Sequence, residues 1–313
     1  MNKWEKLLSG KLSSTLIAIG CALLWGSAFP TLKVAFKEFS VEASISGRIL
    51  VAGFRFFGAS MILFLISAKI GVFKRRIGAG KYLELFFLGI FQTTLQYFFF
   101  YNGLANITGM KAAVLASSGT FFLVVIAHFV YHDDRLSWQK TLGLITGFVG
   151  IVLANWGKGF TWSFAFNGEG FLLITGVVNA IGTIMAKRLS RDVHPFMVSG
   201  VQMLFGSLIL LFVGFITLTP GITITPLGVV LLIYSAFLSA IAFGLWYSLL
   251  KYHKAGEISI FKFIIPIAGS TFSSIVLPSE SFTLAILFAL GFVSLGIYAV
   301  NSAAKAGWPK KSD

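Results

Sequence analysis

Two glutamines, Gln92 and Gln96, lie four residues apart in a stretch without charged residues from Leu85 to Met110. This spacing places both amides on one face of a helix. An amide inside an apolar segment should face protein or water rather than lipid, so the pair could bind a polar solute. The alternative is a hydrogen bond between helices, worth about 0.6 kcal/mol. Tyr97 lies beside the pair, and Asn179 presents the same two alternatives in a later apolar stretch.

Two cations also lie within apolar stretches. Arg55 is well inside its segment, and Lys262 comes four residues before Pro266. A cation at the centre of a membrane costs about 2.5–3.5 kcal/mol on insertion scales. Arg55 could cap backbone carbonyls between helices or attract a solute. Lys262 could extend toward the membrane surface, or it could attract a carboxylate or phosphate.

The first apolar segment contains Trp25, Gly26 and Pro30. Trp25 could stack on a solute, Gly26 lets two helices approach closely, and Pro30 bends its helix and frees a carbonyl. We expect a substrate cavity formed by Trp25, Gln92, Gln96, Tyr97, Ser118, Asn179, Trp246 and Lys262. Structural or gating roles are expected for Gly26, Pro30, Arg55 and Pro266.

The sequence lacks the patterns of catalysis. It has one cysteine and four histidines, with no phosphate-binding glycine loop and no pairing of a nucleophile with a base. The acidic residues lie at the ends of apolar stretches or between them, which gives no support for proton coupling through a buried carboxylate. We therefore expect no enzyme activity, no catalytic residue, no cofactor and no metal.

The elements that position these residues are membrane helices. Of 313 residues, 57% are hydrophobic and only 12% are charged, about half the charged share of a soluble domain. A membrane-spanning helix needs about 20 mainly apolar residues. The sequence predicts an all-α integral membrane protein with ten transmembrane helices, at about 12–35, 44–67, 84–104, 112–131, 139–156, 169–188, 197–218, 227–249, 256–277 and 283–303.

The net charge of +14 comes from lysines and arginines that gather at the ends of alternate apolar runs. This pattern favours anchoring at the cytoplasmic side over nucleic-acid binding, and it places both termini inside. The two halves also resemble each other, since a shift of 146 residues sets Asp134 against Glu280. With five spans in each half, the second half must be inverted. We expect repeats at 12–156 and 165–304, followed by a cytoplasmic tail at 305–313.

Each half contains several short motifs. The first half has Leu24-Trp25-Gly26-Ser27-Ala28-Phe29, Arg55-Phe56 and Asp134-Arg135-Leu136-Ser137, and the second has Asn179-Ala180, Leu245-Trp246-Tyr247, Pro266 and Ser279-Glu280. On these residues the chain resembles the EamA-domain family of the drug/metabolite transporter superfamily. The resemblance implies ten helices with cytoplasmic termini and a central cavity between the first, third, fourth, sixth, eighth and ninth. Thr120 and Lys262 depart from the family pattern, which has proline at the first position and a small or neutral residue at the second.

The expected function is secondary transport or export of small metabolites by alternating access, with amino acids or related polar and amphipathic solutes as the first candidates. One alternative is an organic-anion carrier that uses Lys262 and Arg55. Another is a lipid-handling membrane protein. The expected partners are a small-molecule substrate and the lipid bilayer, with no nucleic acid, and a homodimer is left open. The expected location is the cell membrane.

Overall fold

The structure is a computed structural model that describes residues 3–72, 77–106, 115–155, 164–217 and 221–276, with single positions between 284 and 296. The described residues form helices and contain no strand. The predicted tenth helix lies largely outside the described residues, as do Ser279, Glu280 and the predicted tail.

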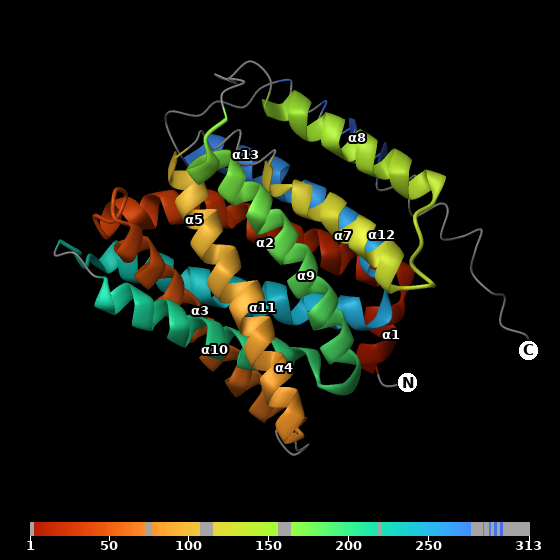
Figure 1. The fold of residues 1–313 in the computed structure, drawn as a ribbon, viewed down its shortest axis with the longest axis horizontal. Helices are drawn as coiled ribbons and strands as arrows, with labels where there is room; N and C mark the ends of the chain where they lie inside the picture. The colour runs from red at the N-terminus through yellow and green to blue at the C-terminus, as the bar shows by residue number, and fades with distance from the viewer. Residues whose placement is uncertain are drawn as a thin grey trace, which may run out of the picture.

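The helices follow one another along the whole described chain (Figure 1). Their bounds are α1 Lys3–Ser9, α2 Lys11–Glu38, α3 Ile45–Lys69, α4 Ala79–Gly89, η2 Ile90–Leu95, α5 Gln96–Asn106, α7 Ser118–Val130, α8 Trp138–Asn155, η3 Phe166–Gly170, α9 Phe171–Asp192, α10 Pro195–Ile216, α11 Pro226–Tyr252, α12 Ala255–Ser259, η4 Ile260–Phe263 and α13 Ile264–Val276. Two spans are composite: α4, η2 and α5 form one continuous span, and α12, η4 and α13 form another.

Seven helical segments of the described chain are long and apolar enough to cross a membrane, and α7 is a shorter apolar helix. They carry exposed large apolar side chains along their outer faces, among them Leu16, Leu65, Phe129 and Phe212. Such side chains suit contact with lipid tails. The chain is therefore an all-helical, multi-span membrane protein. The predicted count of ten helices stays a prediction.

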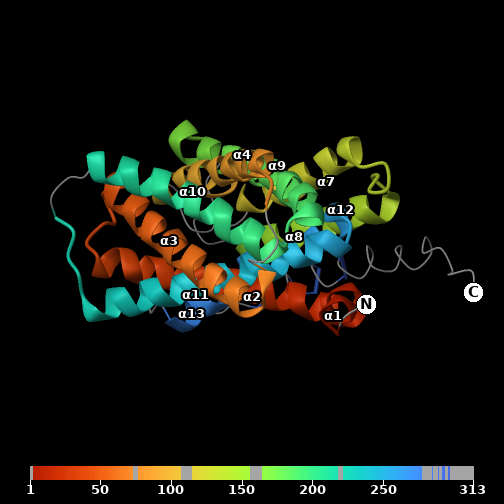
Figure 2. The same ribbon diagram turned by 90° about the horizontal axis from the view of Figure 1, so that it is seen from below.

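The helices pack as an elongated bundle (Figures 1 and 2) in which α3 lies along α10. The helix α2 packs on α11 and α13, while α9 packs on the η2–α5 segment and on α7. If each helix is replaced by its counterpart in the other half, the contacts of α2 become the contacts of α9. This is the pattern expected of two related halves, and their inverted arrangement stays a prediction.

Asp134 joins two helical segments that are far apart in sequence. Its side chain is 1% exposed, and one carboxylate oxygen lies 2.5 Å from Nζ of Lys140. The other oxygen accepts a hydrogen bond of 2.8 Å from the backbone N–H of Gly256, in the first turn of α12. A negative charge is stabilised at a helix N-terminus. Asp134 therefore fixes the start of the α12–α13 span against the segment that joins α7 to α8.

Candidate functional site

A cavity of about 530 Å³ lies in the centre of the bundle. Its walls come from α2, α3, α7, α9 and α11 and from the two composite spans. These include all six helices that the family resemblance implied, and α3 is added to them by Arg48 and Arg55. The volume fits a small organic molecule.

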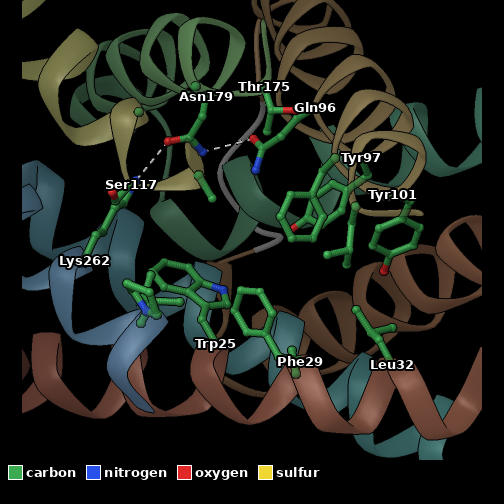
Figure 3. Close-up of a pocket in the computed structure, with 18 of the residues that line it drawn as sticks. Trp25, Phe29, Leu32, Gln96, Tyr97, Tyr101, Ser117, Thr175, Asn179 and Lys262 are labelled. Carbon is green, nitrogen blue, oxygen red and sulfur yellow. Dashed lines mark hydrogen bonds between the residues drawn. The ribbon is translucent and has the colours of Figure 1, made fainter. Parts of the chain in front are cut away.

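A chain of hydrogen bonds crosses one wall of this cavity (Figure 3). Nζ of Lys262 donates to Oδ1 of Asn179 at 3.2 Å, and Nδ2 of Asn179 donates to Oε1 of Gln96 at 3.0 Å. Nε2 of Gln92 donates to the same oxygen of Gln96 at 2.7 Å. Four residues that the sequence predicted as cavity residues therefore meet in one polar chain, defined here as Lys262–Asn179–Gln96–Gln92.

The position of Gln92 depends on a local change of helix type. Ile90–Leu95 forms a π-helical turn between α4 and α5. A π-helical turn adds a residue to the helix and shifts the side chains that follow, and such turns are frequent at functional sites. Here Gln92 lies within the turn and Gln96 is the first residue after it. The four-residue spacing of Gln92 and Gln96 in the sequence did not predict this π-helical turn.

We predict that Gly182→Ala will disturb Gln92 and lower the stability of the protein. A Cβ at Gly182 would lie 3.1 Å from the amide carbon of Gln92 and closer still to its oxygen. Excess volume at a packed position costs about 1–3 kcal/mol. Gly20→Ala is the matched control, because a Cβ there would meet no heavy atom within 4 Å. Thermal unfolding of both purified variants tests this, and equal unfolding temperatures would contradict it.

Aromatic rings form a second wall of the cavity. The rings of Trp25 and Trp246 meet edge to face with centroids 5.2 Å apart, and Trp25 meets Phe243 in the same way at 5.3 Å. Nζ of Lys262 lies 5.2 Å from the ring centre of Trp246, within the range of a cation–π interaction. This wall, which we call the aromatic wall, consists of Trp25, Phe243 and Trp246 and lies next to the polar chain.

Three polar groups near the aromatic wall are buried and have no hydrogen-bond partner among the described residues. They are the indole N–H groups of Trp25 and Trp246 and the hydroxyl of Tyr247. The side-chain oxygen of Gln92 is also buried and has no hydrogen-bond partner among these residues. A buried polar group without a partner costs about 1–3 kcal/mol. All four residues line the cavity, but neighbouring atoms cover the unpaired groups, so each could contact a solute only after its side chain moves.

The two arginines of α3 are bound by neutral groups. Nε of Arg55 donates to the hydroxyl of Ser239 at 2.8 Å, and its NH1 donates to Tyr101 at 3.2 Å. These are hydroxyl oxygens, not the backbone carbonyls considered from the sequence. Arg48, about two turns earlier in α3, donates to the backbone oxygen of Glu42 at 2.5 Å and to Oδ1 of Asn102 at 3.2 Å.

The structure places three predicted residues outside the cavity lining. Gly26 meets α13, since a Cβ there would lie 2.5 Å from Cβ of Ala268. Pro30 is buried within α2. Ser118 was expected in the cavity, but its hydroxyl lies against Gly176, and its neighbour Ser117 lines the cavity instead. The remaining predicted residues line it, namely Trp25, Arg55, Gln92, Gln96, Tyr97, Asn179, Trp246, Lys262 and Pro266.

Sequence reasoning missed several lining residues. On α2 the cavity is lined by Trp25, Phe29, Leu32 and Phe36, which recur every three or four residues. This periodicity marks one face of a helix and could have identified them from Trp25. Arg48 and Thr175 also line the cavity, and no comparable pattern in the sequence identified them.

Comparison with known proteins assigns the family. A model of the EamA-like transporter family matches residues 12–156 and 166–302. The chain belongs to this family. The relatives of this EamA protein include an uncharacterised transporter of Archaeoglobus fulgidus, 27% identical over 88% of this chain and 94% of the relative. A WAT1-related chloroplast protein of Arabidopsis thaliana is 26% identical over 96% of this chain and 73% of the relative.

A solved crystal structure has the same fold as this EamA protein. The two agree with a TM-score of 0.77 at 17% sequence identity, over 95% of this chain and 99% of the other. The family and the Archaeoglobus relative are named as transporters, so the chain is a multi-span membrane transporter of the EamA family. The resemblance seen in the sequence is thereby confirmed.

Proposed function

We propose that this EamA protein is a secondary transporter that moves small polar or amphipathic metabolites by alternating access, and that the central cavity binds them. Amino acids are the first class to test, and export is the direction proposed. The observation that carries the proposal is the polar chain Lys262–Asn179–Gln96–Gln92, which lies in a cavity deep between membrane-spanning helices. Polar groups at such depth serve solute pathways more often than lipid contact.

The two ends of the cavity differ, which supports alternating access. At one end the lining includes Glu42, in the exposed loop between α2 and α3, and the exposed residue Ala105 near the end of α5. We call this the open end. Thr223, just before α11, donates to the backbone oxygen of Glu38 at the same end, so α11 begins there and finishes at the opposite end.

That opposite end, the closed end, is held by buried contacts. Lys140 and Gly256 bind Asp134 there, and Nζ of Lys187 donates to the backbone oxygen of His253. The His253 ring contacts the backbone oxygen of Leu8 at 2.7 Å. Burial lowers the pKa of His253 below its usual value, so its ring is neutral near pH 7. Opening of this end while the other closes would carry a solute across.

The positive-inside pattern of the sequence supports a cytoplasmic location for the closed end and for both termini, in a protein of the cell membrane.

The first experiment is a thermal-stability screen of the purified chain against amino acids and related metabolites. A ligand present at 100 times its Kd stabilises a protein by about 2.7 kcal/mol. We expect at least one solute to raise the unfolding temperature and to exchange across proteoliposomes. Exchange that is unaffected by substitutions in the polar chain would contradict the proposal.

A further inference from the structure

The cavity carries an excess of positive charge. Its charged lining residues are Lys33, Arg48, Arg55 and Lys262 on the positive side and Glu42 on the negative side. Glu42 and its hydrogen-bond partner Arg48 lie at the open end, and Lys33 is exposed, so deeper in the cavity the charged lining residues are Arg55 and Lys262, without a carboxylate among the described residues. Low-dielectric walls strengthen the field of such charges and concentrate anions between them.

Three of these cations lack an internal counter-ion. The described residues contain no carboxylate within 4.0 Å of Arg48, Arg55 or Lys262. Arg55 has hydroxyl partners, and Arg48 has a backbone oxygen and an amide oxygen. Charges removed from water are normally paired with an opposite charge. An anion bound in this cavity would supply the missing opposite charge.

Lys262 is the cation best placed to bind a solute. Its side chain is partly exposed, its hydrogen-bond partner is the neutral amide of Asn179, and the ring of Trp246 lies beside its ammonium. A hydrogen bond at 3.2 Å to an amide leaves further donors of the ammonium free, since an ammonium has three. An anion beside Lys262 would satisfy both charge and hydrogen bonding.

The donor groups around the cavity also match an acceptor-rich ligand. The ammonium of Lys262 donates and cannot accept, and Trp25 and Trp246 line the cavity beside it, although their indole nitrogens are covered by neighbouring atoms in this structure. The aromatic wall beside them offers an apolar surface for the rest of the solute. A carboxylate bears acceptors alone, so it fits this set better than an ammonium or a neutral amide does.

We infer that the solute of this cavity is an organic anion, a carboxylic acid with an apolar or aromatic body, whose carboxylate binds beside Lys262 and whose body lies on the aromatic wall. This inference rests on the proposed function and narrows its substrate class. It also separates organic acids from amino acids. The ammonium of an amino acid would meet the cationic middle of the cavity and would be repelled there.

Charged thiol reagents measure the sign of the cavity potential without knowledge of the natural solute. The single native cysteine is replaced in Cys21→Ala, and a new cysteine is placed at Ile265, a lining residue three positions after Lys262. Ile224→Cys is the control, because Ile224 is 78% exposed in the segment before α11. Each full-length variant reacts with anionic 2-sulfonatoethyl methanethiosulfonate and, separately, with its cationic trimethylammonium counterpart.

We expect the ratio of anionic to cationic rates to be about tenfold higher at Ile265→Cys than at Ile224→Cys, as focused fields change encounter rates by 10–10³. Adding Lys262→Gln should lower this ratio several-fold, whereas Lys262→Arg should keep it because the charge persists. A ratio equal to or below the control would overturn the anion assignment and leave the transporter proposal standing. Reaction at Ile224→Cys with none at Ile265→Cys would contradict both, because no aqueous route would then reach the cavity.

A matched set of ligands tests the carboxylate itself. The probes are 3-phenylpropanoate, its neutral amide 3-phenylpropanamide, and phenylalanine, which adds an ammonium to the same skeleton. Millimolar 3-phenylpropanoate should slow modification of Ile265→Cys by uncharged methyl methanethiosulfonate. Protection by the amide should be about tenfold weaker, because it lacks the carboxylate and its charge-assisted hydrogen bond. Protection by phenylalanine should also be about tenfold weaker, because its ammonium is repelled by the cations of the cavity. Equal or better protection by phenylalanine or the amide would overturn the inference while supporting a transporter of other metabolites. Absence of protection by the acid would overturn it too.

Discussion

Replacement of Asp134 by asparagine (D134N) should destabilise the protein by about 3–5 kcal/mol, the usual cost of removing one partner from a buried ion pair. The side chains of Asp134 and Lys140 are 1% and 6% exposed, with 2.5 Å between carboxylate oxygen and Nζ. An asparagine could still accept from Gly256, but it would leave the ammonium of Lys140 without its counter-charge. Chemical or thermal unfolding of the purified variant in one detergent measures the effect.

The chain offers a matched control for this prediction. Asp192 forms an ion pair with Lys81 at 2.9 Å, but its side chain is 58% exposed. Asp192→Asn should therefore change stability little, because an exposed pair is screened by solvent. The double variant Asp134→Leu with Lys140→Met should recover much of the loss, since apolar residues of similar volume often replace a buried pair at little cost. Equal losses for Asp134→Asn and Asp192→Asn would contradict the structural role of Asp134.

Replacement of Gln96 by leucine should lower solute transport by about tenfold to a hundredfold. This is the effect expected when a binding site loses one or two hydrogen bonds to the solute. The oxygen of Gln96 accepts from both Gln92 and Asn179, so leucine would break the polar chain in its middle. Asn179 would then orient Lys262 poorly, because the two are joined by a hydrogen bond. Uptake or exchange in proteoliposomes, normalised to folded protein, is the measurement.

Ser118→Ala is the control for Gln96→Leu. Ser118 is a polar residue of a neighbouring helix that lies outside the cavity lining, and its hydroxyl has no hydrogen-bond partner among the described residues. Its loss should leave transport near the wild-type rate. If Gln96→Leu instead reduced the amount of folded protein in proportion to transport, the polar chain would be a packing feature and not a binding site.

Within the part of the chain that the structure describes, the sequence predicted helices with bounds close to those observed, because charge-free stretches of about 20 residues have few alternatives to a membrane helix. One clear difference is at α4. The sequence predicted a start near residue 84, whereas the helix begins at Ala79. The difference has a physical cause, since Lys81 is within the helix and pairs with Glu84 and Asp192. Charged residues that find partners extend a membrane helix beyond its apolar part.

The candidate site was predictable in its residue types but not in its connections. Polar side chains in apolar segments pointed to Gln92, Gln96, Asn179 and Lys262, which the structure joins. Helical spacing alone could not choose between Ser117, the residue before α7, and Ser118, its first residue. Packing of α7 against Gly176 decides between them. The partners of Arg55 come from α5 and α11, far away in sequence, and no local pattern predicts them.

The central claim is that one cavity faces the two sides of the membrane in turn. A single cysteine at Thr120, a buried lining residue, tests this directly in the Cys21→Ala background. Membrane-impermeant thiol reagents are applied to right-side-out and inside-out vesicles, with Ile224→Cys and Ser137→Cys as markers of the outer and inner faces. We predict that Thr120→Cys reacts from both faces while each marker reacts from one. Reaction of Thr120→Cys from a single face under all conditions would contradict alternating access through this cavity.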